Sequence, residues 1–475
     1  MKKIVLMLAA GILFAWQGLG LAATSGVDSL IQKLEDKGIL TSQEAQQIKG
    51  EITSDEKNSQ EKTFKTMLPD WVSGLKISGD FRLRDQIQVR KAPGGSASGN
   101  NFDQNRARIR ARLNFEDQIN DKVKLVVGIA TDGESNRSNN LTLGGNGKTD
   151  GLTNTTTDTF GKADVVLNKA YAVYTPASWA TLMGGKMDNP IWEPGPGGAG
   201  SSFFWDPNIT PEGGSIQLQK KLNEYITPWI QGDVFDLHAA TPTAALKTDP
   251  YMLVTQGGLK GDLTEHIYYK GAVTWYDISN PSHLSFGEGL GINSGTTSGG
   301  GGRLTYNFND VIVGSADMGI NDPFGEMLPS PIFIPQIGIF GDYADNTSNS
   351  KDVPVNTGRN RQNKAWMAGA YMGNSSLNGW GTWKLASYYK VLGRDAWLDV
   401  LPDADFYSGQ TNVKGWRSEL DIGLMKNLWF TMAWFHSNIY KIDPGIQGVS
   451  ANGTNTSPSV KAPENLFQMD LNFKF

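Results

Sequence analysis

Residues 467–475, at the end of the chain, read Phe-Gln-Met-Asp-Leu-Asn-Phe-Lys-Phe, so apolar and polar side chains alternate without a break. Successive side chains of a β-strand point to opposite faces, and this segment therefore has one apolar face and one polar face. Residues 77–89 and 106–113 follow the same period of two, and the second segment carries an arginine at every other position. We interpret the chain as a β protein whose strands separate two environments.

A soluble β-sandwich also alternates, so three further features are needed to choose between a sandwich and a membrane barrel. The strand patterns run for about ten residues or more, longer than the five or six usual in soluble sheets. Aromatic residues lie near predicted strand ends, as at Trp179, Trp380 and Trp429, where outer-membrane barrels carry aromatic girdles. The connections alternate between short and long, as periplasmic turns and external loops do in such barrels.

The connections also predict the number of strands. The short ones are residues 118–121, 175–178, 222–224, 262–265, 308–310, 375–379 and 425–427. The long ones are residues 91–103, 134–161, 187–214, 238–249, 279–300, 320–363, 392–412 and 441–463. We predict an all-β membrane barrel: an antiparallel transmembrane β-barrel of about sixteen strands (roughly 14–18), wide enough for an aqueous channel.

The parity of the arginines predicts which face they occupy. An arginine on the lipid face of a barrel costs about 2–4 kcal/mol at the membrane midplane, so four in one strand would cost on the order of 10 kcal/mol. We therefore expect a lumen-facing arginine ladder on two neighbouring strands. Its members are Arg82, Arg84, Arg106, Arg108, Arg110 and Arg112.

The composition excludes several classes of protein. The 475 residues include no cysteine, 43 Lys and Arg, and 48 Asp and Glu. The absence of cysteine excludes disulfide scaffolds, cysteine-ligated zinc, iron–sulfur clusters and covalently attached haem. The lack of a basic excess argues against a nucleic-acid partner. The four histidines lack the spacing of a zinc site, and no catalytic fingerprint lies in a suitable context, so we expect no enzyme, no cofactor and no metal.

The N-terminal segment has the pattern of a secretory signal peptide over residues 1–23. Lys2 and Lys3 precede an apolar run, and Ala22 and Ala23 offer small residues for cleavage. The alternative is a retained membrane anchor, but glycines within the run make a poor membrane span. No later apolar stretch approaches the length of a spanning helix, so an exported chain of this kind would cross a membrane as strands.

Residues 24–66 are predicted to form a short periplasmic helical hairpin or coiled coil, followed by a linker. Apolar residues recur there at helical spacing, and residues 41–44 (Thr-Ser-Gln-Glu) have the pattern of a capping box. The apolar face is too small to fold well alone. We keep two interpretations open: a stem that oligomerises or touches the cell wall, and a partly ordered leader.

Three stretches resemble segments of a known family. Residues 30–41 resemble the leader that often precedes such barrels, residues 184–188 (Gly-Gly-Lys-Met-Asp) a glycine-basic strand end, and residues 205–213 a loop rich in Asp, Pro and Glu-Gly. With the period-two strands and the terminal Phe475, the chain resembles the putative porin family of Gram-negative outer membranes. Members more often carry arginine at the position of Lys186.

The resemblance implies a function and partners. It implies passive diffusion of ions and small hydrophilic solutes through a channel in the lipid bilayer of the outer membrane. It also implies a homotrimer, and recognition of a C-terminal aromatic signal, here Phe473 and Phe475, by the outer-membrane assembly machinery.

The resemblance further implies an inward loop. In sixteen-stranded porins the loop after the fifth strand commonly folds into the barrel, and here it spans about residues 187–212. Its candidate residues are Lys186, Asp188, Glu193, Asp206 and Glu212. We hypothesise that its carboxylates face the arginine ladder across a constriction, where opposed charges order water and select polar solutes. The alternative is an external loop with solvated acids.

Three functions remain open from the sequence. The leading one is a passive porin. The second is a substrate-selective channel for anions such as phosphate, suggested by the arginine ladder. The third is a barrel that sheathes a partner such as a multihaem cytochrome in an electron-transfer conduit, and an inward charged loop would argue against it.

Overall fold

The computed structural model describes residues 74–90, 102–132, 138–144, 164–196, 202–237, 250–279, 294–295, 303–304, 308–325, 334–348, 361–398, 401–441, 448–449, 455–456 and 463–475. The predicted signal peptide (1–23), helical hairpin and linker (24–66) lie outside the described residues and stay predictions. The barrel belongs to the compact unit Leu75–Phe475.

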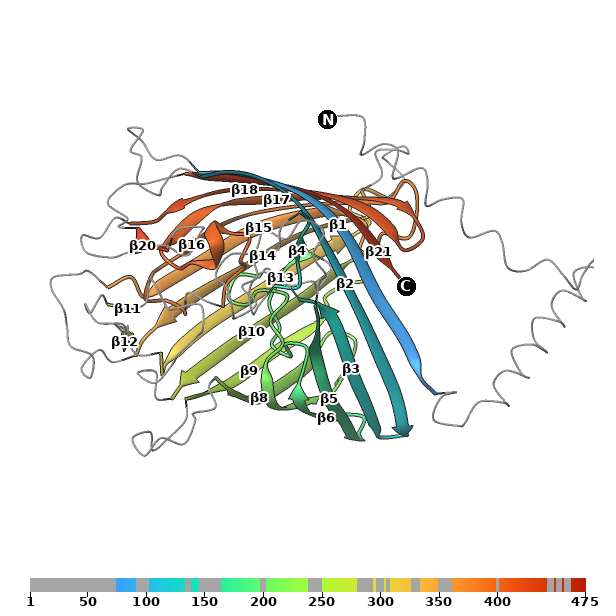
Figure 1. Cartoon of the computed structure of the whole chain (residues 1–475). Coiled ribbons are helices and arrows are strands. Elements are labelled where there is room, and N and C mark those ends of the chain that lie inside the picture. The colour runs from blue at the N-terminus through green and yellow to red at the C-terminus, as the bar shows by residue number, and fades with distance from the viewer. Residues whose placement is uncertain are drawn as a thin grey trace, which may run out of the picture. The chain divides into compact units, whose positions relative to one another are not determined.

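Sixteen antiparallel strands close into a barrel within this unit (Figure 1). The strands are β1 (Lys76–Arg90), β2 (Phe102–Asn120), β3 (Val123–Thr131), β5 (Val165–Ala177), β6 (Ala180–Lys186), β7 (Glu212–Gln219), β8 (Thr227–Asp236), β9 (Tyr251–Asp262), β10 (Ile267–Ile278), β13 (Val311–Asn321), β14 (Gln336–Asn346), β15 (Lys364–Gly373), β16 (Trp383–Leu392), β17 (Val413–Met425), β18 (Leu428–Ile439) and β21 (Glu464–Lys474). The predicted barrel fold and strand number are confirmed.

Shorter elements complete the sheet inventory. The two-residue β4 (Leu141–Thr142) pairs with β2, as a seventeenth strand of the same sheet. Two small hairpins pair β11 (Ser294–Gly295) with β12 (Arg303–Leu304), and β19 (Gly448–Val449) with β20 (Asn455–Thr456).

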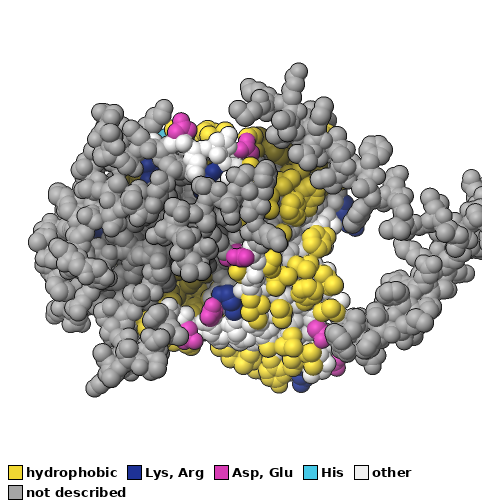
Figure 2. Space-filling model, viewed as in Figure 1, with side chains coloured by type: hydrophobic (Ala, Val, Ile, Leu, Met, Phe, Trp, Pro, Cys, Tyr) yellow, Lys and Arg dark blue, Asp and Glu magenta, His cyan; other side chains and the backbone are white. Residues whose placement is uncertain are grey.

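Alternation sorts the side chains between the two faces of the barrel wall. In β21, Gln468 and Asp470 are buried toward the interior, whereas Phe467 and Met469 are exposed on the outside. The same parity holds in β1, where Arg84 is buried. Figure 2 shows hydrophobic side chains gathered on the outer wall of the strands in view. An apolar exterior over a polar interior is the arrangement that a membrane barrel requires.

The barrel closes through the last residue of the chain. β1 pairs with both β2 and β21, and Phe475 N donates to Gly79 O over 3.0 Å while Gly79 N donates to Phe475 O over 2.9 Å. A Cβ on Gly79 would lie 2.5 Å from Cζ of Phe475, so glycine leaves the space that this ring occupies. Phe473 packs on Phe81 with ring centroids 5.9 Å apart.

Two predicted connections are wrong. Residues 308–310 were predicted as a short turn, but they belong to the long connection between β10 and β13. The long connection predicted over residues 320–363 contains strand β14. The two errors cancel in the strand count. Four prolines lie among residues 322–335, before β14, and a polar stretch follows it at residues 347–363, so the sequence pattern of a turn and a strand was interpreted as one loop.

The predicted aromatic girdle is correct in part. Trp179 and Trp380 are exposed in the short connections that follow β5 and β15. Trp429 instead lines an internal cavity of about 610 Å³, because it shares the parity of its pairing partner Asn472, which is buried. The prediction for Trp429 was therefore wrong, since a tryptophan at a strand end has either of two faces available.

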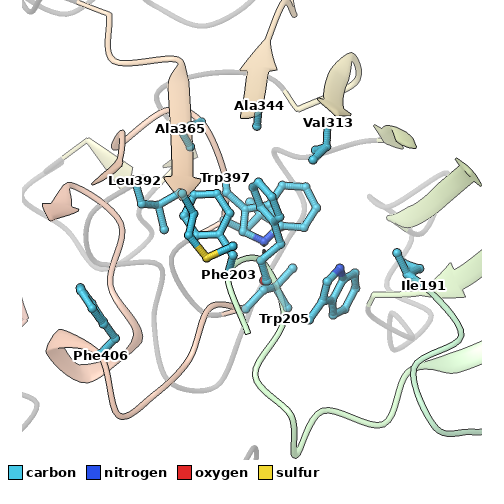
Figure 3. Packing of buried hydrophobic residues seen from close by; sticks show 14 of the residues in the cluster. Ile191, Phe203, Trp205, Val313, Ala344, Ala365, Leu392, Trp397 and Phe406 are labelled. Carbon is cyan, nitrogen blue, oxygen red and sulfur yellow. Dashed lines mark hydrogen bonds between the residues drawn. The ribbon is translucent and has the colours of Figure 1, made fainter. Parts of the chain in front are cut away.

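A cluster of buried apolar side chains lies inside the barrel. It joins two loops, residues 187–211 after β6 and residues 393–412 after β16, to inward residues of the wall. Trp397 lies at its centre, with Phe203 and Trp205 of the first loop close by (Figure 3). Trp397 Nε1 also donates to the carbonyl of Phe204 over 2.8 Å. Apolar loop residues that would be exposed outside the barrel are thus buried within it.

Candidate functional site

The six predicted ladder arginines lie together on one wall. They line a cavity of about 610 Å³ inside the barrel. The antiparallel register of β1 and β2 explains the cluster, because it pairs Arg82 with Arg110 and Arg84 with Arg108. Each inward position on one strand therefore has an inward neighbour on the other, and two rows of arginine become one continuous positive surface.

Three carboxylates of the described residues contact this ladder. Asp80, on β1, accepts from Arg110 over 2.9 Å and from Arg112 over 2.7 Å. Asp470, on β21, accepts two bonds of 2.8 Å from Arg84. Asp405 is the third, at 2.9 Å from Arg84, and it belongs to the loop after β16.

Amide groups also position the ladder. Arg106 Nη2 donates to Gln88 Oε1 and Arg108 Nη1 to Gln86 Oε1, each over 3.3 Å. Arg108 also donates to the carbonyl of Asn140 over 3.2 Å. Amides orient a guanidinium without neutralising it, so these hydrogen bonds do not themselves reduce the positive charge of the wall.

Asp206 joins the two inward loops. Its backbone N donates to Leu401 O over 2.6 Å, and its side chain accepts from Ala404 N and from Asn208 N, each over 2.8 Å. Burial raises the pKa of Asp206 to about 6, and the nearby Asp403 adds to the effect. Of the five residues predicted for the constriction, Asp206 alone lines the same cavity as the whole ladder.

Glu193 is buried within its own loop. Its Oε1 accepts from Phe204 N over 3.0 Å, which ties the two described halves of the loop together. Burial raises the pKa of Glu193 to about 8, with a further increase from the charge of Asp342. This carboxyl therefore stabilises the loop. It also lines a second cavity, of about 270 Å³, which Arg112 lines as well.

The remaining predicted residues lie at the edges of the site. Asp188 accepts from Lys169 over 2.7 Å and from the Tyr171 hydroxyl over 3.1 Å, beside the second cavity. Lys186 and Glu212 pair with each other over 2.6 Å where β6 ends and β7 begins. Neither of these two lines either cavity.

Sequence reasoning missed the loop after β16. Asp403 lines the ladder cavity from this loop together with Asp405. Burial would raise the pKa of Asp405, but Arg84 holds it below its usual range. The signal was the apolar content of residues 396–401 (Ala-Trp-Leu-Asp-Val-Leu), which is unusual for a loop exposed to water.

The wall beside this loop carries both signs of charge. Arg417 on β17 binds Glu419 over 2.6 Å and lies 3.5 Å from Asp403. Lys384 on β16 lies 3.5 Å from Asp421. All five residues line the ladder cavity, so charge surrounds it on several sides. In the described part of the chain, no three His, Asp or Glu side chains form a group that could hold a metal ion.

A closed barrel with an apolar exterior and a charged interior defines a membrane channel. The family model described as "Putative porin" matches residues 91–283 and 335–475. The chain therefore belongs to the putative porin family. No curated protein compared with the chain matches it.

The chain is also similar to solved structures at low identity. A mutant of the porin of Rhodopseudomonas blastica is 9% identical, with a TM-score of 0.38, and the alignment covers 84% of this chain and 100% of that one. The outer membrane channel DcaP of Acinetobacter baumannii is 11% identical, with a TM-score of 0.43, covering 84% of this chain and 97% of that one.

Proposed function

We propose that this porin mediates passive diffusion of ions and small hydrophilic solutes, through a passage between the arginine ladder and the two inward loops. The observation that carries the proposal is the ladder cavity itself. Arginines of β1 and β2 form one side of it, and Asp206, Asp403 and Asp405 reach it from the loops. A charged cavity beside a packed apolar cluster gives water and polar solutes a favourable environment on this side of the barrel.

The opposed charges give the passage a transverse field. Guanidinium groups on the strands face carboxylates on the loops, and fields across a narrow low-dielectric opening order water and favour polar solutes. In this proposal Arg108 and Arg110 act on the passing solute, whereas Glu193 and Asp206 keep the loops in place. Lys186 and Glu212 stabilise the base of the first loop.

The charge balance favours a second candidate, an anion-preferring channel. Within the part of the chain that the structure describes, eight Lys and Arg line the ladder cavity: Arg82, Arg84, Arg106, Arg108, Arg110, Arg112, Lys384 and Arg417. Six acids of the described residues line it: Asp206, Asp403, Asp405, Glu419, Asp421 and Asp470. Asp80, which pairs with Arg110 and Arg112, adds a seventh negative charge beside it and leaves an excess of positive charge. An excess of positive charge raises the local concentration of anions.

The cluster inside the barrel argues against the sheath for an electron-transfer partner. Trp397, Phe203 and Phe204 are each no more than 1% exposed within the lumen. A haem protein threaded through the barrel would have to displace this packed core, at a cost of several kcal/mol for the large side chains alone.

Membership of the family supports a proposal for the location and assembly of the protein. We place the mature chain in the outer membrane after export and signal-peptide cleavage, and assign Phe473 and Phe475 to recognition by the assembly machinery. A homotrimer is supported by Asp85, which lies on the outer face between Leu83 and Ile87 of β1. A carboxylate there is unfavourable against lipid, whereas a second protein copy could hydrate or bind it.

Single-channel recording in planar bilayers tests the proposal. We expect a steady ohmic conductance, with a reversal potential in a KCl gradient that favours chloride. Replacing both Arg108 and Arg110 (R108Q/R110Q) should move the reversal potential toward potassium, while K122Q, in an exposed turn, should leave it unchanged. A protein without conductance would refute the porin function, and an unmoved reversal potential would refute the role of the ladder.

A further inference from the structure

A third cavity, of about 350 Å³, lies toward the end of the barrel that carries the short turns. It shares Asn189, Ile191 and Trp192 with the second cavity, which in turn shares Arg112 and Asp206 with the ladder cavity. The three cavities are therefore neighbours along one side of the first inward loop. Along this series the second cavity follows the ladder cavity, and the third cavity follows the second.

Two tryptophans and a lysine form one wall of the third cavity. Trp192 and Trp229 meet edge to face, with ring centroids 6.5 Å apart. Lys270 Nζ lies 4.4 Å from the centroid of Trp192 and 5.3 Å from that of Trp229. An ammonium group on aromatic rings keeps its charge available to an approaching anion.

Trp192 is held in place by a buried side chain of the wall. Gln256 on β9 is fully buried, and its amide both accepts from Trp192 N over 2.9 Å and donates to Trp192 O over 2.8 Å. The same amide nitrogen donates to Thr274 over 2.7 Å. This loop position is therefore rigid, which suits a preformed binding surface.

The polar lining of this cavity favours a negatively charged ligand. Lys260 lines it as well, and its ammonium donates to Gln219 over 3.1 Å. Among the described residues, no carboxylate lines the cavity and neither lysine forms an ion pair. Trp229 Nε1 is buried with no acceptor within that same part of the chain. The two lysine ammonium groups and the unpaired indole N–H of Trp229 would all be satisfied by a negatively charged hydrogen-bond acceptor.

We propose that the third cavity is a binding station for an aromatic carboxylate on its way through the channel. The carboxylate would lie between Lys260 and Lys270, and the ring would pack on Trp192 and Trp229. The ring of the ligand then gains apolar contact, and its carboxylate gains positively charged partners. Water provides both kinds of interaction poorly. The inference rests on the proposed channel function, and adds a site and a ligand class to it.

Benzoate is a suitable probe because it is a small aromatic carboxylate. Isothermal titration calorimetry on the folded, detergent-solubilised protein should show saturable binding of benzoate, and acetate should bind at least tenfold more weakly because it lacks the ring. K270M and K260M should each weaken benzoate binding about tenfold, and W229L should remove most of the preference over acetate. K122M, in the exposed turn after β2, is the matched control and should bind like the parent.

The results separate the inference from the channel function. Any of three results would refute the proposed binding site. These are equal binding of benzoate and acetate, an unchanged affinity for benzoate in both K270M and K260M, and tighter binding of neutral glucose than of benzoate. In bilayers, benzoate should reduce the chloride current of the parent but not of K270M. A K270M channel that conducts normally and no longer binds benzoate supports the station, whereas benzoate binding without any conductance would refute the porin function alone.

Discussion

Arg84 of β1 binds Asp405 of the loop after β16 over 2.9 Å, while the same guanidinium makes two bonds of 2.8 Å to Asp470 of β21. One side chain thus joins the first strand, the last strand and an inward loop. Charge-assisted bonds of this kind are strong and directional. The contact ties the position of the loop to the place where the barrel closes.

Neutralising Asp405 tests that contact. D405N removes a negative charge from the ladder cavity and weakens the hold of Arg84 on the loop. We expect a shift of the reversal potential toward chloride and an increase in single-channel conductance. The matched control is D121N, in the exposed turn between β2 and β3. A shift toward potassium would contradict the assigned geometry.

Removing the carboxylate of Asp206 should loosen both loops together. D206A leaves the amides of Ala404 and Asn208 without their acceptor, and each unsatisfied buried amide costs about 1–3 kcal/mol. We expect more current noise in the open channel and faster limited proteolysis within residues 393–412. D262A, at the exposed end of β9, should show neither effect. Equal proteolysis rates in D206A and the parent would contradict the linking role.

The docking of the first loop should depend on pH through Glu193. Burial raises the pKa of Glu193 from its ordinary 4.5 to about 8, so the folded loop holds the proton more tightly than the released loop does. The stabilisation is complete below pH 4.5 and is lost as the pH rises through about 8. Current noise should therefore grow between pH 6 and 9. E193Q, which cannot ionise, should remove this dependence; a noise profile unchanged in E193Q would refute it.

Asp85 should matter to assembly more than to folding. D85L replaces the carboxylate on the outer face with a lipid-compatible side chain. If that face meets a second copy, the oligomer should dissociate at a lower temperature on native or mild-detergent gels, with the monomer still folded. T255L makes a matched polar-to-apolar change on the exposed face of β9. An unchanged oligomer and a more heat-stable monomer would instead place Asp85 against lipid.

The C-terminal residue should control the yield of closed barrel. Deleting Phe475 removes two backbone bonds to Gly79 and the ring that packs over it. We expect a lower folded fraction, seen as lost heat-modifiable mobility on gels after expression in the outer membrane. G79V should lower it through clashes with the carbonyl oxygen of Arg112 and with the same ring. F475Y keeps the aromatic ring and should fold normally. Normal yield from the deletion would remove the case for an assembly signal here.

Local rules accounted for most of the barrel. The period of two in residues 467–475 and in β2 predicts which side chains face inward, because the face of a strand residue depends only on its parity. The ladder arginines could be grouped for the same reason. The strand number was correct although two connections were misplaced, since residues 308–310 and β14 show how poorly sequence defines strand ends.

Contacts between distant segments were beyond these rules. Nothing near Arg84 in the chain indicates that its partner is Asp405, which lies 321 positions away. Trp429 had two faces available, and only pairing with β21 assigned it to the interior.

The amino-acid sequence alone established a closed membrane sheet with an apolar exterior and an arginine-rich interior. This follows because a strand residue's environment is set by its immediate neighbours and by the high cost of charge in lipid. The choice of loops that fill the lumen, and of the acids that meet the arginines, came only from the folded molecule. Burial of Trp397 against Phe204 depends on the closed barrel bringing two distant loops into one space.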